Sequence, residues 1–172
     1  MQVARTASRF ARTIAAIIVV AGIAACAEKP KVDASMGQGG YGQGGGPVTP
    51  GSAREFAVKV GDTVYFTTDS TDLTPDAQNT LRAQAQWLKQ YPQYTVTVEG
   101  HADERGTREY NLGLGAKRSA NVRTYLASQG IEAARMRTIS YGKERPVAVC
   151  NDISCWSQNR RSQTALNKRA GS

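Results

Sequence analysis

The glycine-rich stretch GQGGYGQGGG, at positions 37–46, limits what this chain can fold into. Seven of its ten residues are glycine, and the sequence PVTPGS follows it directly. A segment of this composition cannot bury an apolar core, so we expect a flexible linker here. The remaining residues, 55–172, are long enough for one compact domain with a core of its own.

Residues 1–25 have the features of a secretory signal peptide. Three arginines and no acidic residue precede an apolar run that ends in small residues before Cys26. This run is shorter than the ~20 residues that a membrane-spanning helix needs. The run ends in IAAC, which resembles the lipobox of bacterial lipoproteins, in which the cysteine is acylated and becomes the first residue. The alternative is an ordinary signal peptide cleaved near Ala25, with Cys26 as an incidental thiol.

The lipobox resemblance implies that residues 26–54 are a lipidated cysteine followed by the linker. Ala27 stands where an Asp often retains such lipoproteins at the inner membrane, so we expect the outer membrane, with the domain facing the periplasm. The formal net charge is +8, and loss of the three signal-peptide arginines leaves +5. That basic balance suits an anionic partner, such as a cell-wall polymer or an acidic protein.

Strand-like and helix-like patterns alternate along residues 55–172. Three segments are predicted as strands, and a fourth follows them: 58–66, 94–100, 136–142 and 159–166. A helix is predicted over 73–93, with Thr74 as its N-cap and a buried stripe of Ala77, Leu81, Ala85 and Leu88. The order β-α-β-α-β-β predicts an α/β (α+β) sandwich, with the helices packed on one face of a mixed four-stranded sheet.

A second helix is predicted from Asn111 to Gln129, with Gly130 as its C-cap. The expected core stripe of this helix is Leu112, Ala116, Ser119, Val122 and Leu126.

The segment 100–122, GHADERGTREYNLGLGAKRSANV, is unusually charged for a stretch between a predicted strand and helix, where α/β proteins tend to bind ligands. His101 is the only histidine, so a metal site lacks ligands, and no serine or cysteine stands beside it as a nucleophile. The glycine spacing fits neither a P-loop nor a dinucleotide fingerprint. The arginines lack the interleaved aromatic residues typical of nucleic-acid binding. We therefore expect no metal, no cofactor, no nucleic acid and no enzymatic activity.

A binding site fits this segment better. Asp103 lies in the loop, and Arg118 lies on the helix near the point where that loop must pass. One anion and one cation facing each other suit a zwitterion, such as a free amino-acid head group. The alternatives are a charged surface turn, or an Asp103 and Arg118 that pair with each other or with backbone and only hold the loop.

Three motifs together resemble the OmpA-like domain and, within it, the peptidoglycan-associated lipoproteins: VEGHADERGTREYNLGLGAKRSANV, SYGKERP and NRR. The resemblance covers about residues 60–165, and the lipobox and linker match the anchor of that family. It implies non-covalent binding to meso-diaminopimelate in uncrosslinked peptidoglycan stem peptides. It also implies TolB and other Tol components as partners, with a role in envelope integrity and cell division.

Carried over by position, the resemblance implies that Asp103 accepts the ligand ammonium and that Arg118 holds its carboxylate. It implies five further contacts, from the closing loop, the apolar wall and the end of the first strand: Arg105, Thr107, Leu114, Thr68 and Asp69. The sequence departs from the family at YFTTDS, where threonines replace the usual Asp and Phe. Two other classes stay open, a lipoprotein that binds only periplasmic proteins and a cell-wall hydrolase.

Cys150 and Cys155 are expected to form a disulfide. Acylation of Cys26 leaves this even pair of cysteines in an oxidising compartment. The alternatives are two free thiols or a redox pair. Closing so short a loop contributes only ~2 kcal/mol, so the bridge would shape the loop more than hold the fold.

Overall fold

The computed structural model describes residues 48–168. The predicted signal peptide, Cys26 and the glycine-rich stretch lie outside the described residues. Four strands form one sheet in the order β1-β4-β2-β3: β1 (Thr63–Tyr65), β2 (Tyr94–His101), β3 (Met136–Gly142) and β4 (Arg161–Lys168). β3 pairs parallel to β2, whereas β4 pairs antiparallel to both β1 and β2. The carboxyl ends of β1, β2 and β3 therefore lie at one edge of the sheet.

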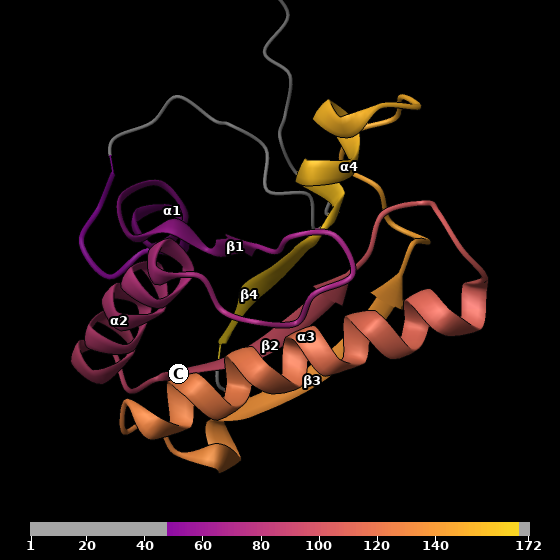
Figure 1. The fold of residues 1–172 in the computed structure, drawn as a ribbon. Helices are drawn as coiled ribbons and strands as arrows, with labels where there is room; N and C mark the ends of the chain where they lie inside the picture. Colours follow the sequence, from indigo (N-terminus) through magenta and orange to yellow (C-terminus); the bar gives the residue numbers. More distant parts are fainter. Residues whose placement is uncertain (1–47, 169–172) are drawn as a thin grey trace, which may run out of the picture. The chain divides into compact units, whose positions relative to one another are not determined.

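The two long helices, α2 (Pro75–Gln90) and α3 (Arg108–Ser128), pack on the same face of this sheet (Figure 1). The shorter helical segments are α1 (Ala53–Glu55), the π-helical η1 (Phe56–Gly61), the 3-10 turn η2 (Ala133–Arg135) and α4 (Ile153–Asn159). The predicted fold class, with helices on one face of a mixed four-stranded sheet, is confirmed. Within residues 48–168, no helix has the length and apolar character needed to cross a bilayer.

The ends of the long helices follow from local side-chain chemistry. The Thr74 hydroxyl accepts a hydrogen bond from the Ala77 amide at the start of α2, as predicted for its N-cap. All four residues of the predicted α2 stripe are buried. At the other end of α3, Gly130 adopts a φ of +90°, and the Ile131 amide donates to the Leu126 carbonyl. Gly130 thus ends the helix, as predicted.

The strand predicted over 58–66 is wrong in its first half. The π-helical η1 covers Phe56–Gly61, and β1 is only three residues long. A helical backbone places Phe56 and Val60, four residues apart, on one side. Both pack on the core, with the Phe56 ring 4.9 Å from that of Trp87 on α2. Burial of an i, i+4 apolar pair therefore decides the conformation here over β propensity.

The stripe predicted for α3 is wrong in its first half as well. Leu112 and Ala116 are exposed, and the face that turns inward carries Asn111, Gly115 and Arg118. The reason is a close backbone approach between helix and sheet, because a Cβ at Gly100 on β2 would overlap the Gly115 carbonyl. The face of α3 that turns toward the sheet is therefore the one with a glycine at the close contact, and not the most apolar one. The helix also begins one turn earlier than predicted, at Arg108, because Thr107 caps it.

We expect Gly100→Ala to destabilise the domain by about 1–3 kcal/mol, because the added methyl group would force α3 away from β2. Gly113→Ala is the matched control on α3, since a Cβ there meets nothing within 4 Å. That variant should instead gain ~0.5–1 kcal/mol in helix propensity. Urea unfolding of both variants checks the pair, and equal stabilities would contradict the close approach.

Candidate functional site

A pocket of about 300 Å³ lies at the edge where β1 and β2 end. The loop after β1, the loop after β2, the first half of α3 and the residue before β4 contribute its walls. The lining residues are Thr68, Asp69, Asp103, Arg105, Gly106, Tyr110, Asn111, Leu114, Arg118 and Arg160. The fold thus brings six of the seven predicted ligand residues together around one cavity.

Arg118 is fully buried on α3, and each of its guanidinium nitrogens donates to a backbone carbonyl. Nε donates to Ser70 (2.9 Å), Nη1 to His101 (2.8 Å) and Nη2 to Thr67 (3.2 Å). These bonds hold the loop after β1 against the end of β2. Of the five guanidinium N–H groups, one on each terminal nitrogen remains for a ligand. Burial lowers the pKa of Arg118 to about 10, so its charge persists at neutral pH.

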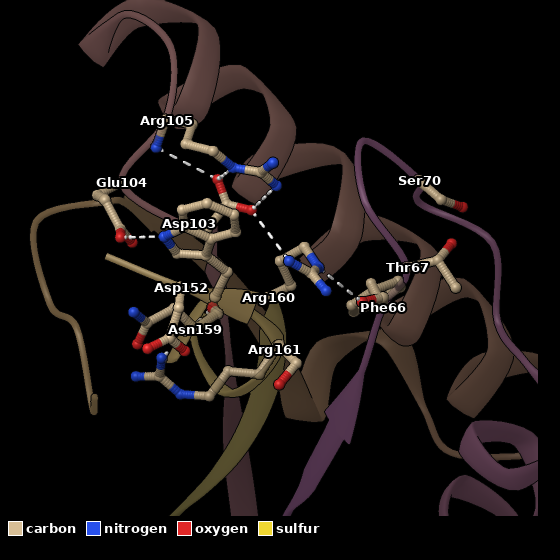
Figure 2. A network of polar contacts seen from close by, with 12 residues as sticks. Phe66, Thr67, Ser70, Asp103, Glu104, Arg105, Asp152, Asn159, Arg160 and Arg161 are labelled. Carbon is tan, nitrogen blue, oxygen red and sulfur yellow. Dashed lines mark hydrogen bonds and ion pairs between the residues drawn. The ribbon is translucent and has the colours of Figure 1, made fainter. Parts of the chain in front are cut away.

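The Asp103 carboxylate lies between two guanidinium groups (Figure 2). Arg105 donates from Nη2 to Oδ2 at 2.6 Å, and Arg160 donates from Nη1 to the same oxygen at 3.2 Å. Burial by itself would raise the pKa of Asp103, but the hydrogen bonds from Arg105 and Arg160 outweigh it and lower the pKa. Asp103 therefore stays ionised at neutral pH and presents an anion in the pocket.

Arg160 is a pocket residue that the sequence analysis did not assign to the ligand site. Its side chain is only 6% exposed, and its Nε also donates to the Phe66 carbonyl at 3.2 Å. Arg105 differs, because its side chain is 42% exposed. The sequence contained a signal for Arg160, since it stands in the NRR motif, but nothing local indicated its contact with Asp103, 57 positions earlier.

The loop after β1 presents Asp69 in a strained conformation. Its φ is +55°, the only positive φ of a non-glycine residue in the described range. The hydroxyl of Tyr110, on α3, donates to the Asp69 carboxylate. Arg118 holds the carbonyls of Thr67 and Ser70, on either side of Asp69. Asn121, also on α3, donates to the Thr71 carbonyl at 2.9 Å, so α3 bonds to this loop at four points. Tyr110 is a second lining residue that the sequence analysis missed.

Of two further residues predicted to contact the ligand, Leu114 lines the pocket and Thr107 lies next to it. Leu114 is partly buried and lines the pocket one turn before Arg118, whereas Thr107 is not among the lining residues. The Thr107 hydroxyl accepts a hydrogen bond from the Tyr110 amide and caps α3. Asn111 holds the closing loop from behind, with its Nδ2 donating to the Arg105 carbonyl at 2.6 Å.

The segment before β4 is held by a disulfide and by local hydrogen bonds. Cys150 and Cys155 are joined by a disulfide with their Cα atoms 5.6 Å apart, so the predicted pairing is confirmed. The Asp152 carboxylate caps α4 by accepting from the Ser154 amide. Asn159 accepts from the amides of Val147 and Ala148 at 2.9 and 3.2 Å, which closes the segment on itself.

His101 lies beside the site and has a different chemistry. Its ring is 2% exposed, neither ring nitrogen has a hydrogen-bond partner, and the Glu99 carboxylate is 3.8 Å away. Burial lowers the pKa of His101, so the ring is neutral at pH 7. Among residues 48–168, no group of His, Cys, Asp and Glu side chains is arranged to hold a metal ion.

We expect His101 to make the domain less stable as the pH falls below about 6.5. The unfolded histidine takes up a proton there, whereas the folded one resists it, so folding loses up to ~1 kcal/mol by pH 5.5. His101→Phe should remove this loss, and no other histidine exists to mask it. Urea unfolding at pH 7.5 and 5.5 measures the difference, and equal pH dependence in both proteins would contradict the assignment.

Comparisons with known proteins identify the family of the chain. Residues 65–160 match the model of the OmpA family. The chain is 60% identical to a peptidoglycan-associated lipoprotein of Agrobacterium fabrum, over 89% of this chain and 86% of that protein. The chain belongs to the peptidoglycan-associated lipoproteins of the OmpA family. This family consists of non-enzymatic structural proteins, which confirms the prediction that the chain is not an enzyme.

Solved structures share the fold. The crystal structure of the peptidoglycan-associated lipoprotein from Burkholderia pseudomallei is 43% identical, with a TM-score of 0.60 over 62% of this chain and 90% of that one. The C-terminal domain of Helicobacter pylori MotB is 21% identical, with a TM-score of 0.59 over 63% of this chain and 86% of that one. At that identity the second likeness concerns the fold alone.

Proposed function

We propose that this chain is an outer-membrane lipoprotein that binds peptidoglycan non-covalently. Its ligand is the meso-diaminopimelate of uncrosslinked stem peptides, and the binding tethers the outer membrane to the cell wall. The observation that carries the proposal is the pair of opposite charges, Asp103 and Arg118, that line one pocket from a loop and a facing helix. The names of the relatives, peptidoglycan-associated lipoproteins, support it independently.

The ligand chemistry matches the pocket group by group. The free end of diaminopimelate carries an ammonium and a carboxylate on one carbon, with methylene groups behind them. Asp103 accepts the ammonium, and the remaining N–H groups of Arg118 donate to the carboxylate as a forked pair. Leu114 covers the methylene groups, while Arg105, Thr68 and Asp69 close the pocket around the head group. Thr107 acts on the ligand indirectly, through the start of α3 that it caps.

The contact between Asp103 and the ligand ammonium favours peptidoglycan stem peptides that are not crosslinked. Crosslinking turns the free ammonium into an amide, which removes its charge and adds a peptide chain at that nitrogen. Asp103 would then keep only its two arginines and gain no cation from the ligand. The pocket is therefore suited to stem peptides that still carry the free amine.

The domain also acts within the Tol system in this proposal. TolB and other Tol components bind it in exchange with the wall, and this exchange contributes to envelope integrity and to cell division. The support is the family membership of the chain.

We expect Asp103→Asn to weaken sedimentation with purified peptidoglycan by ten-fold or more. Hydrogen bonds to a charged partner contribute ~1.5–3 kcal/mol each, and ~1.4 kcal/mol is a factor of ten. Asparagine keeps the shape and one acceptor oxygen for Arg160. The control is Glu109→Gln, which removes one exposed carboxylate from the first turn of α3 without touching the pocket lining.

Thermal melting of the same variants separates binding from folding. Wall binding lost with a near-normal melt supports the site, whereas unchanged wall binding by Asp103→Asn would refute it. A wild-type protein that does not sediment would favour the lipoprotein that binds only periplasmic proteins.

We expect Cys26→Ala to release the protein from the outer-membrane fraction. The acyl chains that hold a lipoprotein on the bilayer contribute ~0.8 kcal/mol per buried methylene, and the alanine variant has no thiol to carry them. Fractionation of cells that produce either protein measures the change. A variant that matures normally and stays in the outer-membrane fraction at the wild-type level would show that Cys26 is not the anchor.

A further inference from the structure

Trp156, on α4, contacts the loop after β2, which lines the pocket. The guanidinium carbon of Arg105 lies 4.2 Å from the centre of the indole ring. The indole Nε1 donates to the carboxylate of Glu104, the residue between Asp103 and Arg105. We propose that Trp156 is a positioning residue that holds Arg105 in its ligand-binding position beside Asp103. This inference rests on the proposed function and names a determinant of the affinity of that same pocket.

Arg105 is the pocket arginine whose position burial does not fix. The side chain of Arg160 is 6% exposed and Arg118 is fully buried, so packing and backbone carbonyls hold both of them. Arg105 is 42% exposed and has one carboxylate partner, Asp103. An arginine in water moves among many rotamers, and ordering it on ligand binding costs about 0.5–1.5 kcal/mol, or roughly two- to ten-fold in affinity. Stacking on the indole orders the Arg105 side chain already in the free protein, so less entropy is lost when the ligand binds.

Trp156 is itself firmly held. Its neighbour Cys155 is buried and bonded to Cys150, and α4 is capped by Asp152 at one end. At the other end the Asn159 amide ties α4 to the preceding loop. The ring is partly buried, with one face against Arg105. A rigid platform can therefore restrict a flexible side chain, which two mobile residues in contact could not do.

The neighbouring arginine, Arg108, has neither of the contacts that hold Arg105. Arg108 is 69% exposed, bonds only to the exposed Glu144 and does not line the pocket. Both arginines belong to the same charged segment and add the same charge. The difference between them is the indole and the carboxylate of Asp103, so Arg108 is the natural control for effects of charge alone.

The test uses the full-length protein in detergent and a soluble muropeptide that ends in meso-diaminopimelate, with binding measured by calorimetry. We expect Trp156→Ala to weaken binding roughly two- to ten-fold, while Trp156→Phe, which keeps an aromatic face, retains most of the affinity. In an Arg105→Ala background, Trp156→Ala should have no further effect. In an Arg108→Ala background it should keep its full effect, because those two residues share no contact.

Each outcome decides the matter. Loss that depends on Arg105 and is rescued by Phe supports positioning. A Trp156→Ala protein that binds like the wild type would overturn the inference and leave the proposed function standing, as would an equal loss with and without Arg105. A wild-type protein that does not bind the muropeptide would overturn the proposed function and this inference together. Thermal melting of all variants shows whether a loss comes from unfolding.

Discussion

The buried guanidinium of Arg118 is the interaction on which the rest of the site depends. A charge removed from water costs several kcal/mol unless hydrogen bonds replace its hydration. Here backbone carbonyls of Thr67, Ser70 and His101 replace it, and no carboxylate bonds to it in the described part of the chain. These dipoles solvate the charge without neutralising it. Arg118 therefore orders two loops and still has no carboxylate bonded to it, so a ligand carboxylate would be its first direct anionic partner.

That arrangement requires α3 to lie unusually close to β2. Gly100 and Gly115 face each other with no room for a side chain, and Gly115 lies three residues before Arg118 on the helix. At an ordinary helix–sheet separation, set by side chains on both elements, the guanidinium would be held further from the carbonyl of His101, 2.8 Å away here. The two glycines thus allow α3 to pack close to β2, and this packing places Arg118 near the loop after β2, which carries Asp103.

The sequence was sufficient where structure depends on neighbours along the chain. The cap at Thr74, the apolar spacing of α2, the β-branched run of β2 and the glycine after α3 each act within a few residues, and each was predicted. It was insufficient where distant residues decide. The helical turn of η1 depends on Trp87, and the inward face of α3 depends on Gly100. For the same reason Asp103 and Arg118 could be proposed from one segment, but Arg160 and Trp156 could not.

The charged groups that line the pocket indicate which ligands can pair with them. Two carboxylates, Asp69 and Asp103, face three guanidinium groups, those of Arg105, Arg118 and Arg160, so one positive charge is in excess. Under the proposed function, a simple amine would reach Asp103 but leave Arg118 without a bonded carboxylate. A simple acid would bond to Arg118 but leave Asp103 with only the two arginines it already has. A ligand that carries both charges on one carbon would make both contacts, so we expect a zwitterion to bind more tightly than a molecule with either charge alone.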